Sequence, residues 1–226
     1  FRRAARAPEW GLVAGMLVVL SAIYGLDRSG GFFSSYSLQT LIHQVALFGL
    51  LAVGAAVVII AGGIDLSVGA VVALASVISA KLLTSWLPGA SASSAAPPPI
   101  GTVAAAVALN LLMGLLVGLL HALLINQLRL PPFIATLATL AGLRSLAAVI
   151  SQQRPIVVPF DSFRKLGSDP WITVPLFAAV ALVISVMMGK TVLGRHLYAL
   201  GGNETAARLS GLSIPRLKLI AYGLSG

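Results

Sequence analysis

The residue best placed to do chemistry is Asp65, which lies in the apolar stretch AGGIDLSVGA at 61–70. An ionisable group inside an apolar run is a candidate ion or proton site, because burying a charge is costly. The same spacing supports a structural role. Gly62 and Gly63 end one helix, and Asp65 then caps the next, with Ser67 close enough to help satisfy its free N–H groups. We favour the helix cap and keep the ion site as the alternative.

Arg144 is the one charge well inside the apolar run 133–150. A guanidinium at that depth must face protein or water rather than lipid. It is either a clamp on neighbouring carbonyl groups or part of a translocation path. Our candidates for such a path are Asn110, Thr136, Thr139 and Arg144.

Asn110 begins a stripe at i, i+4 spacing that continues through Gly114, Gly118 and Ala122. Small residues at this spacing let two helices approach closely, and a polar side chain among them forms a hydrogen bond across the contact. The stripe therefore predicts a helix–helix contact. A polar lining of a substrate path is the alternative.

Other kinds of chemistry lack their motifs. The GKT at 189–191 has no glycine loop before it, so this chain cannot cradle the phosphates of ATP. His43, His121 and His196 are too scattered to suggest a metal site. The GLSG at 223–226 has the GxSG form of some intramembrane serine proteases, but the match is short and no partner histidine is placed for it. We expect no cofactor, no metal and no covalent catalysis.

The longest polar interruption in the sequence runs over residues 190–213. Asn203 is a favourable N-cap there, and Glu204 lies in the first turn, where the helix dipole favours an anion. Gly211 is placed to end the helix in the left-handed conformation. Glu204 and Arg208 are four residues apart and can pair on one face. This predicts a capped helix of about two turns.

A docking surface for a partner and a solvated connector are both consistent with this helix. Docking would use an apolar face of Ala206, Ala207 and Leu209, edged by Glu204 and Arg208 and starting at the Asn203 cap. Caps at both ends favour a surface that must keep its shape, such as a helix laid into a groove on a partner. The pair of glycines before the cap, at 201–202, is expected to form a flexible turn.

Composition shows the class of protein. Hydrophobic residues make up 58% of the chain and charged residues 9%, far below the charged content of about 25% that soluble domains have. This indicates an all-α polytopic membrane protein with one transmembrane domain over 1–226. The net charge of +9 arises from basic residues at the ends of apolar runs, where they set orientation and meet anionic lipid, so it does not indicate nucleic-acid binding.

Six complete membrane spans and the start of a seventh are expected, because each apolar run is long enough to cross the hydrocarbon core. The six runs are 10–26, 38–60, 66–86, 102–124, 133–150 and 172–189, and the seventh helix starts at Pro215. A Pro/Ser/Ala linker at 88–100 and a polar loop at 152–171 separate some of them. The chain opens on Phe1 and ends inside an apolar run, so we expect it to be a fragment.

The loops alternate between two sides, and their basic residues are unequally shared. One side holds nine, namely Arg2, Arg3, Arg6, Arg129, Lys190, Arg195, Arg208, Arg216 and Lys218. The other side holds four, namely Arg28, Arg154, Arg164 and Lys165. The positive-inside rule then predicts that the N-terminus and the 190–213 loop are cytoplasmic.

Three stretches together resemble the membrane permease subunits of bacterial ABC importers of the ribose/xylose/galactose type. They are GGIDLSVGA at 62–70, PPFIATLATLAGLRSLA at 131–147 and TVLGRHLYALGGNETAARLSGL at 191–212. The resemblance covers nearly the whole chain in the right order, although the linker at 88–100 is unusually rich in Ala, Ser and Pro. It implies a bundle of about ten helices in the full-length protein.

The resemblance also implies a function and a set of partners. We expect a monosaccharide importer of the bacterial inner membrane that pairs with a second permease subunit, as a homodimer, with cytoplasmic ATPase subunits and with a periplasmic sugar-binding protein. In this reading, 190–213 is a cytoplasmic coupling loop. An ion-coupled secondary transporter, with Asp65 as its buried carboxylate, is the alternative, and an intramembrane protease using Ser225 is a more distant one.

Overall fold

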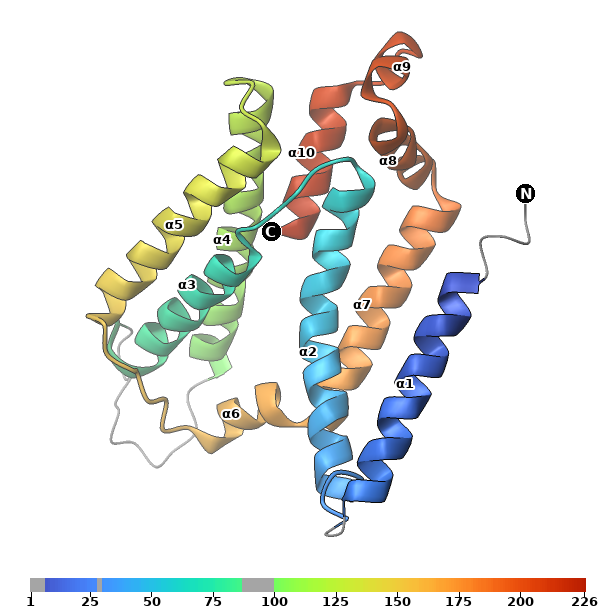
Figure 1. Ribbon diagram of the computed structural model, residues 1–226. Helices are drawn as coiled ribbons and strands as arrows, with labels where there is room; N and C mark the ends of the chain where they lie inside the picture. The colour runs from blue at the N-terminus through green and yellow to red at the C-terminus, as the bar shows by residue number, and fades with distance from the viewer. Residues whose placement is uncertain (1–6, 28–29, 87–99) are drawn as a thin grey trace. The chain divides into compact units, whose positions relative to one another are not determined.

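The computed structural model describes residues 7–27, 30–86 and 100–226, and every regular element in those ranges is helical (Figure 1). This confirms the all-α prediction. The chain divides into two compact units, Phe1–Val45 and Ala46–Gly226. We describe each unit by itself.

The first unit contains α1, Ala7–Leu26, and the beginning of α2, Ser35–Ile60. The turn between these helices is held by Asp27, whose carboxylate accepts hydrogen bonds from the backbone N–H of Gly31 at 3.2 Å and of Phe32 at 2.7 Å. Because it accepts hydrogen bonds from two backbone N–H groups, the Asp27 carboxylate stabilises the conformation of this turn.

The second unit takes in the rest of α2 and all later helices. These are α3 Val68–Lys81, the π-helical extension η1 Leu82–Trp86, α4 Ile100–Asn126, α5 Pro132–Ser151, α6 Asp161–Ser168, α7 Pro170–Lys190, α8 Val192–Gly202, α9 Glu204–Leu209 and α10 Ile214–Ser225. Five helical segments of the described residues are long and apolar enough to cross a membrane: α2, α3 with η1, α4, α5 and α7.

The predicted spans coincide with helices to within a few residues. The first predicted span, 10–26, lies within α1, and its apolar part Trp10–Leu26 is shorter than the other five segments. The linker predicted at 88–100 lies outside the described residues except for Ile100, which starts α4. The loop at 152–171 contains the short helix α6, which the sequence reading did not predict.

The glycine stripe of α4 packs against α10, as its spacing predicts. A Cβ added to Gly118 would collide with the backbone carbonyl of Tyr222, and one added to Gly114 would collide with that of Gly226. Ala122, one turn further on, is buried beside Tyr222. The two backbones can approach this closely only because these positions lack side chains.

Residues 192–202 form the helix α8, so the prediction of a flexible glycine turn at 201–202 was wrong. Thr191 caps α8, because its hydroxyl oxygen accepts a hydrogen bond from the Gly194 N–H at 3.2 Å. Leu197 and Leu200 are buried on its inner face, with Leu193 partly buried beside them. The signal was present in the sequence as a Thr cap followed by leucines at helical spacing.

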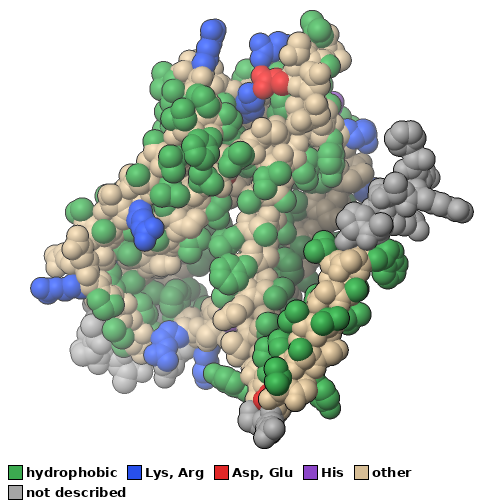
Figure 2. All heavy atoms as spheres, in the orientation of Figure 1, with side chains coloured by type: hydrophobic (Ala, Val, Ile, Leu, Met, Phe, Trp, Pro, Cys, Tyr) green, Lys and Arg blue, Asp and Glu red, His purple; other side chains and the backbone are tan. Residues whose placement is uncertain are grey.

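On the face of the second unit seen in Figure 2, basic side chains lie mostly toward its two ends, and hydrophobic side chains cover the stretches between them. One end carries three connections: the segment after α2, the turn between α4 and α5, and α8 with α9 (Figure 1). Their residues line shared pockets, which places them together independently of the view.

We expect Gly118→Ala to destabilise the second unit, since the new methyl group meets backbone that cannot rotate away. Overpacking of this kind costs about 1–3 kcal/mol. Gly142→Ala on α5 is the matched control, because nothing lies within 4 Å of its added Cβ. Thermal unfolding in detergent measures both variants. Equal midpoints would contradict the close α4–α10 packing.

Candidate functional site

The first candidate site is the non-helical segment between α2 and α3, residues 61–67. The helix ends in a Schellman motif: Gly62 has φ +81°, its N–H donates to the Ile59 carbonyl at 3.0 Å, and the Gly63 N–H donates to the Val58 carbonyl at 2.9 Å. Glycine adopts this left-handed conformation without steric cost. The chain then passes down to α3, which begins well below the end of α2 in Figure 1.

Asp65 does not cap α3 in the predicted way. The N-cap residue is Ser67, which makes no side-chain capping bond. Asp65 lies two residues earlier and accepts from the Ser67 N–H at 2.9 Å and from the Ser67 hydroxyl at 2.7 Å. This is an Asx-turn, so Asp65 has a local structural role, but the prediction that it is the N-cap of α3 was wrong. Its carboxylate bonds the N–H of the N-cap residue Ser67 rather than an N–H in the first turn of the helix.

Other polar groups lie around Asp65. The Ser225 hydroxyl of α10 donates to the second carboxylate oxygen at 3.4 Å. His121 of α4 is 1% exposed, and its Nε2 lies 2.6 Å from the Thr139 hydroxyl of α5. Asp65, Ser67, His121 and Ser225 all line one small cavity of about 70 Å³. The segment 61–67, α4, α5 and α10 therefore contribute polar groups to one partly buried cluster.

This cluster lacks the arrangement needed for nucleophilic catalysis. Ser225 donates to Asp65 at 3.4 Å and His121 pairs with Thr139, so the described residues contain no hydrogen bond between this serine and the histidine that could activate it. The described residues also contain no group of three or more His, Cys, Asp and Glu that could hold a metal. The sequence reading dismissed His121 as isolated. Its place on the packed face of α4, three residues after Gly118, is the signal that could have indicated a buried role.

The candidate path residues do not come together in one place. The Thr136 side chain is fully buried, and its hydroxyl is shared between the Pro132 carbonyl of its own helix at 3.1 Å and the Ile64 carbonyl at 3.3 Å, so it contacts the segment 61–67 from α5. Thr139 contacts His121. Asn110 donates to the Ser79 hydroxyl of α3 at 2.5 Å, so the predicted bond to another helix is present, but it goes to α3 and not to α10, against which the glycines of the same stripe pack.

Arg144 is exposed on α5 and forms no hydrogen bond or ion pair with the described residues. The described residues therefore offer no carbonyl group that Arg144 clamps. A charge in the interior of an apolar helix that its own chain leaves uncovered must meet another protein surface or water.

The second candidate site is α9 with its flanking residues, and its predicted caps are present. The Asn203 side-chain oxygen accepts from the Ala206 N–H at 2.9 Å. Gly211 has φ +84°, and its N–H donates to the Arg208 carbonyl at 3.0 Å. The Leu212 N–H donates to the Ala207 carbonyl at 3.1 Å, which completes a Schellman motif. The helix is thus held in shape at both ends.

Glu204 links α9 to α10 as well as to its own helix. Its carboxylate accepts from Lys218 at 2.9 Å and from Arg208 at 2.9 Å. The hydrogen bond from Lys218, more than any other contact, holds the pKa of Glu204 below its ordinary value. The carboxylate is therefore ionised over the physiological range, and both ion pairs are present there.

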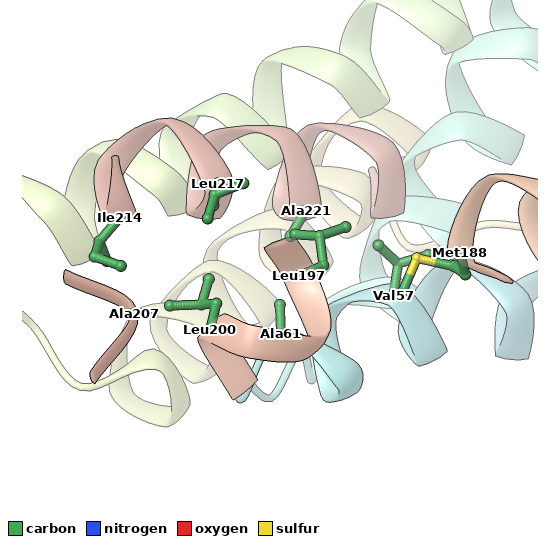
Figure 3. Close-up of a cluster of buried hydrophobic side chains, with 9 residues drawn as sticks. All are labelled: Val57, Ala61, Met188, Leu197, Leu200, Ala207, Ile214, Leu217 and Ala221. Carbon is green, nitrogen blue, oxygen red and sulfur yellow. The ribbon is translucent and has the colours of Figure 1, made fainter. Parts of the chain in front are cut away.

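The apolar face predicted for docking divides into two parts. Ala207 is buried, 4% exposed, and belongs with Leu197, Leu200, Ile214 and other residues to a core cluster shown in Figure 3. Leu209 is 85% exposed, and Ala206 and Arg208 also face outward. Ala207 thus anchors the helix to its own chain, and only the other residues of this face are free to meet a partner.

A groove of about 750 Å³ lies beside α9. Its walls come from the turn between α4 and α5, from α9, and from the start of α10, and they include Arg129, Arg208 and Lys218. The Asn126 side chain donates to the Pro215 carbonyl at 3.0 Å across its floor. Two connections far apart in sequence therefore form one continuous surface.

Residues 37–226 match the protein family described as branched-chain amino acid transport system / permease component. The chain is 31% identical over 218 residues to the ribose import permease protein RbsC of Haemophilus influenzae, a match that covers 93% of this chain and 63% of that protein. It is 34% identical over 219 residues to RbsC of Bacillus subtilis, with 94% and 63% covered.

A third relative is the galactose/methyl galactoside import permease protein MglC of Escherichia coli, 32% identical over 232 residues, with 96% of this chain and 67% of that protein covered. No solved structure matches the chain. The chain spans 63% of the length of the two ribose permeases.

The Asx-turn at Asp65 makes a prediction about stability. Asp65→Asn keeps an oxygen acceptor for Ser67, so we expect a stability close to that of the unchanged protein. Asp65→Leu leaves the buried N–H and hydroxyl of Ser67 without an acceptor, which costs about 1–3 kcal/mol. Folded yield and thermal unfolding in detergent compare the two. A leucine variant as stable as the asparagine variant would show that the turn does not depend on this carboxylate.

Proposed function

Because the chain belongs to the permease-component family of branched-chain amino acid transport systems, we propose that it is the membrane subunit of an ATP-driven importer of a monosaccharide. The observation that carries the proposal is the match to ribose and galactose import permeases over 93% and 96% of the chain. The family match over residues 37–226 includes the segment 61–67, α5 and the loop at 190–213, which contains α8 and α9 and is called the α8–α9 loop below. The names of these relatives favour a pentose or hexose over an amino acid.

In this proposal the chain does no covalent chemistry. ATP binding and hydrolysis in a separate cytoplasmic ATPase bias two packings of the helices, one open outward and one open inward. A second permease subunit, most simply an identical one, completes the membrane part, and a periplasmic sugar-binding protein delivers the sugar. The protein is placed in the bacterial inner membrane as a multi-pass protein, with its N-terminus and the 190–213 loop in the cytoplasm.

We place the ATPase contact at the outward face of α9, made by Ala206, Arg208 and Leu209 next to the Asn203 cap and Glu204. A short helix with fixed ends loses little conformational entropy when it binds in a groove. Ala207 supports this face from within rather than touching the partner, because it is buried against its own chain.

The proposed function is tested by sugar uptake into liposomes that contain the full-length permease with its binding protein, with and without the ATPase. Uptake that requires the ATPase and ATP supports the proposal. Uptake that proceeds without the ATPase and collapses with an ionophore would show instead an ion-coupled transporter, in which Asp65 is the available carboxylate.

The docking face gives a prediction for Leu209→Glu. The added charge enters the partner contact, while the 85% exposed position makes few contacts within the chain, so we expect weaker ATPase binding by at least about tenfold and normal folding. Leu166→Glu is the matched control, since Leu166 is an exposed leucine of α6, 48% exposed. Co-purification with the ATPase measures both. Normal ATPase recovery with Leu209→Glu would remove α9 from the contact.

Arg144 gives a separate prediction. Since it lies exposed on α5 without a partner in the described chain, we place it on the sugar path or at the contact with the second permease. Arg144→Leu should then lower uptake while changing the unfolding free energy of the isolated chain by less than about 0.5 kcal/mol, and Arg144→Lys should restore part of the uptake. A loss of stability that parallels the loss of uptake would return Arg144 to a structural role.

A further inference from the structure

We propose that the segment 61–67 and α8 move as one body, joined by a contact between Gly62 and Gly201, and that this contact carries motion of the α8–α9 loop to the polar cluster around Asp65. The inference rests on the proposed function, because it states how a cytoplasmic ATPase would act on buried residues. It assigns a positioning role to Gly201, a residue that touches neither substrate nor ATPase in that scheme.

The contact is between backbones. A Cβ added to Gly62 would lie 3.2 Å from the Gly201 Cα. A Cβ added to Gly201 would collide with the Ile60 carbonyl oxygen and lie 3.0 Å from the Gly62 nitrogen. The end of α8 therefore rests directly on the end of α2, and neither position tolerates a side chain without a shift of the other.

Side-chain packing surrounds this contact and extends it to α9. Val57 and Ala61, at the end of α2, share one buried cluster with Leu197 and Leu200 of α8 (Figure 3). Ala207 of α9 belongs to the same cluster. Close-packed interiors transmit displacement, because they have few voids to absorb it. A push on α9 is therefore expected to reach the end of α2.

The segment 61–67 carries the displacement further. A Cβ added to Gly63 would lie 2.5 Å from the Tyr222 hydroxyl of α10. The Ile64 carbonyl is bonded by Thr136, and Asp65 is bonded by Ser225. Within a few residues of Gly62, the chain thus contacts α5 and α10, and Asp65 and Ser225 also line the cavity that His121 lines.

The surroundings leave room for movement. A cavity of about 310 Å³ lies beside the contact, between the segment Ala61–Gly63, the end of α8 and α10. Since the segment is not helical, it can change its φ and ψ angles without breaking a helical ladder, as hinge segments do. Because Gly62 is held against α8 and the cavity leaves space beside it, we expect the segment 61–67 to move together with α8.

The contact is tested with Gly201→Ala in the full-length permease, and Gly202→Ala is the matched control. The two changes are chemically identical and adjacent, but nothing lies within 4 Å of a Cβ added to Gly202. We expect Gly201→Ala to bind the ATPase and allow ATP hydrolysis at the unchanged rate, while uptake falls about tenfold, the size of a typical coupling between sites. Gly202→Ala should match the unchanged protein in all three measurements.

The outcomes separate this inference from the proposed function. If the unchanged permease shows no ATP-dependent uptake, the proposed function fails, and the inference fails with it. If the unchanged permease transports and Gly201→Ala transports equally well per ATP hydrolysed, only the inference is overturned. Uptake and hydrolysis that fall together in Gly201→Ala would likewise overturn it, because the contact would then serve assembly rather than coupling.

A second measurement needs no variant and so does not depend on the folding of Gly201→Ala. Hydrogen exchange of the unchanged complex is compared with and without a non-hydrolysable ATP analogue. We expect exchange at the amides of residues 63–67 to change by several-fold along with that of α8, while the middle of α4 stays constant. A change in α8 that leaves residues 63–67 unaffected would overturn the inference.

Discussion

A backbone that leaves helical geometry in the interior of a helical membrane protein must find other partners for its polar groups, because lipid offers none. The segment 61–67 depends on this constraint. Side chains replace the missing helical hydrogen bonds: Asp65 accepts from the Ser67 N–H, and the Thr136 hydroxyl is shared between the Ile64 carbonyl and the Pro132 carbonyl of its own helix. Such a break is tolerated where protein covers it, and here α4, α5, α8 and α10 all supply residues that line the pockets around the segment 61–67.

In contrast to the non-helical segment 61–67, the α8–α9 loop consists of two regular helices joined by a single capping residue. Asn203 ends α8 and caps α9, so two helices meet with no intervening linker. The cap and the Schellman motif fix the ends of α9, while Ala207 and the Glu204–Lys218 pair attach it to the helices behind. An exposed helix of six residues would not be stable alone, and these attachments are what keep its outward face in one place.

Local signals in the sequence were enough to predict the long apolar helices, the caps of α9 and the glycine contact of α4, since each depends on residues close together in the chain. The partner of each surface was harder to predict. In the sequence, Ala207 belongs to an apolar face of a short helix. Which side of that helix is buried depends on its packing against α8 and α10, which the local sequence does not show. The role of His121 likewise depends on Thr139 of α5 and on Asp65 of the segment 61–67, which are distant from it in sequence. The Asx-turn was missed by two residues because a cap and an Asx-turn use the same side chain and nearly the same spacing.

The free-energy cost of a polar side chain in a membrane protein depends on which groups surround it in the fold, and Asp65 and Arg144 differ in this respect. Both interrupt apolar sequence, and both therefore read as functional candidates. Asp65 has acceptor bonds from Ser67 and Ser225 and lies among helices of its own chain, so the described structure already accounts for its presence. Arg144 has no such bonds in the described chain and lies exposed on α5. Because a guanidinium in hydrocarbon is unstable, the surface around Arg144 must be completed from outside the described residues, by protein or by water. In the proposed function, this surface is therefore where we place the sugar path or the second permease subunit.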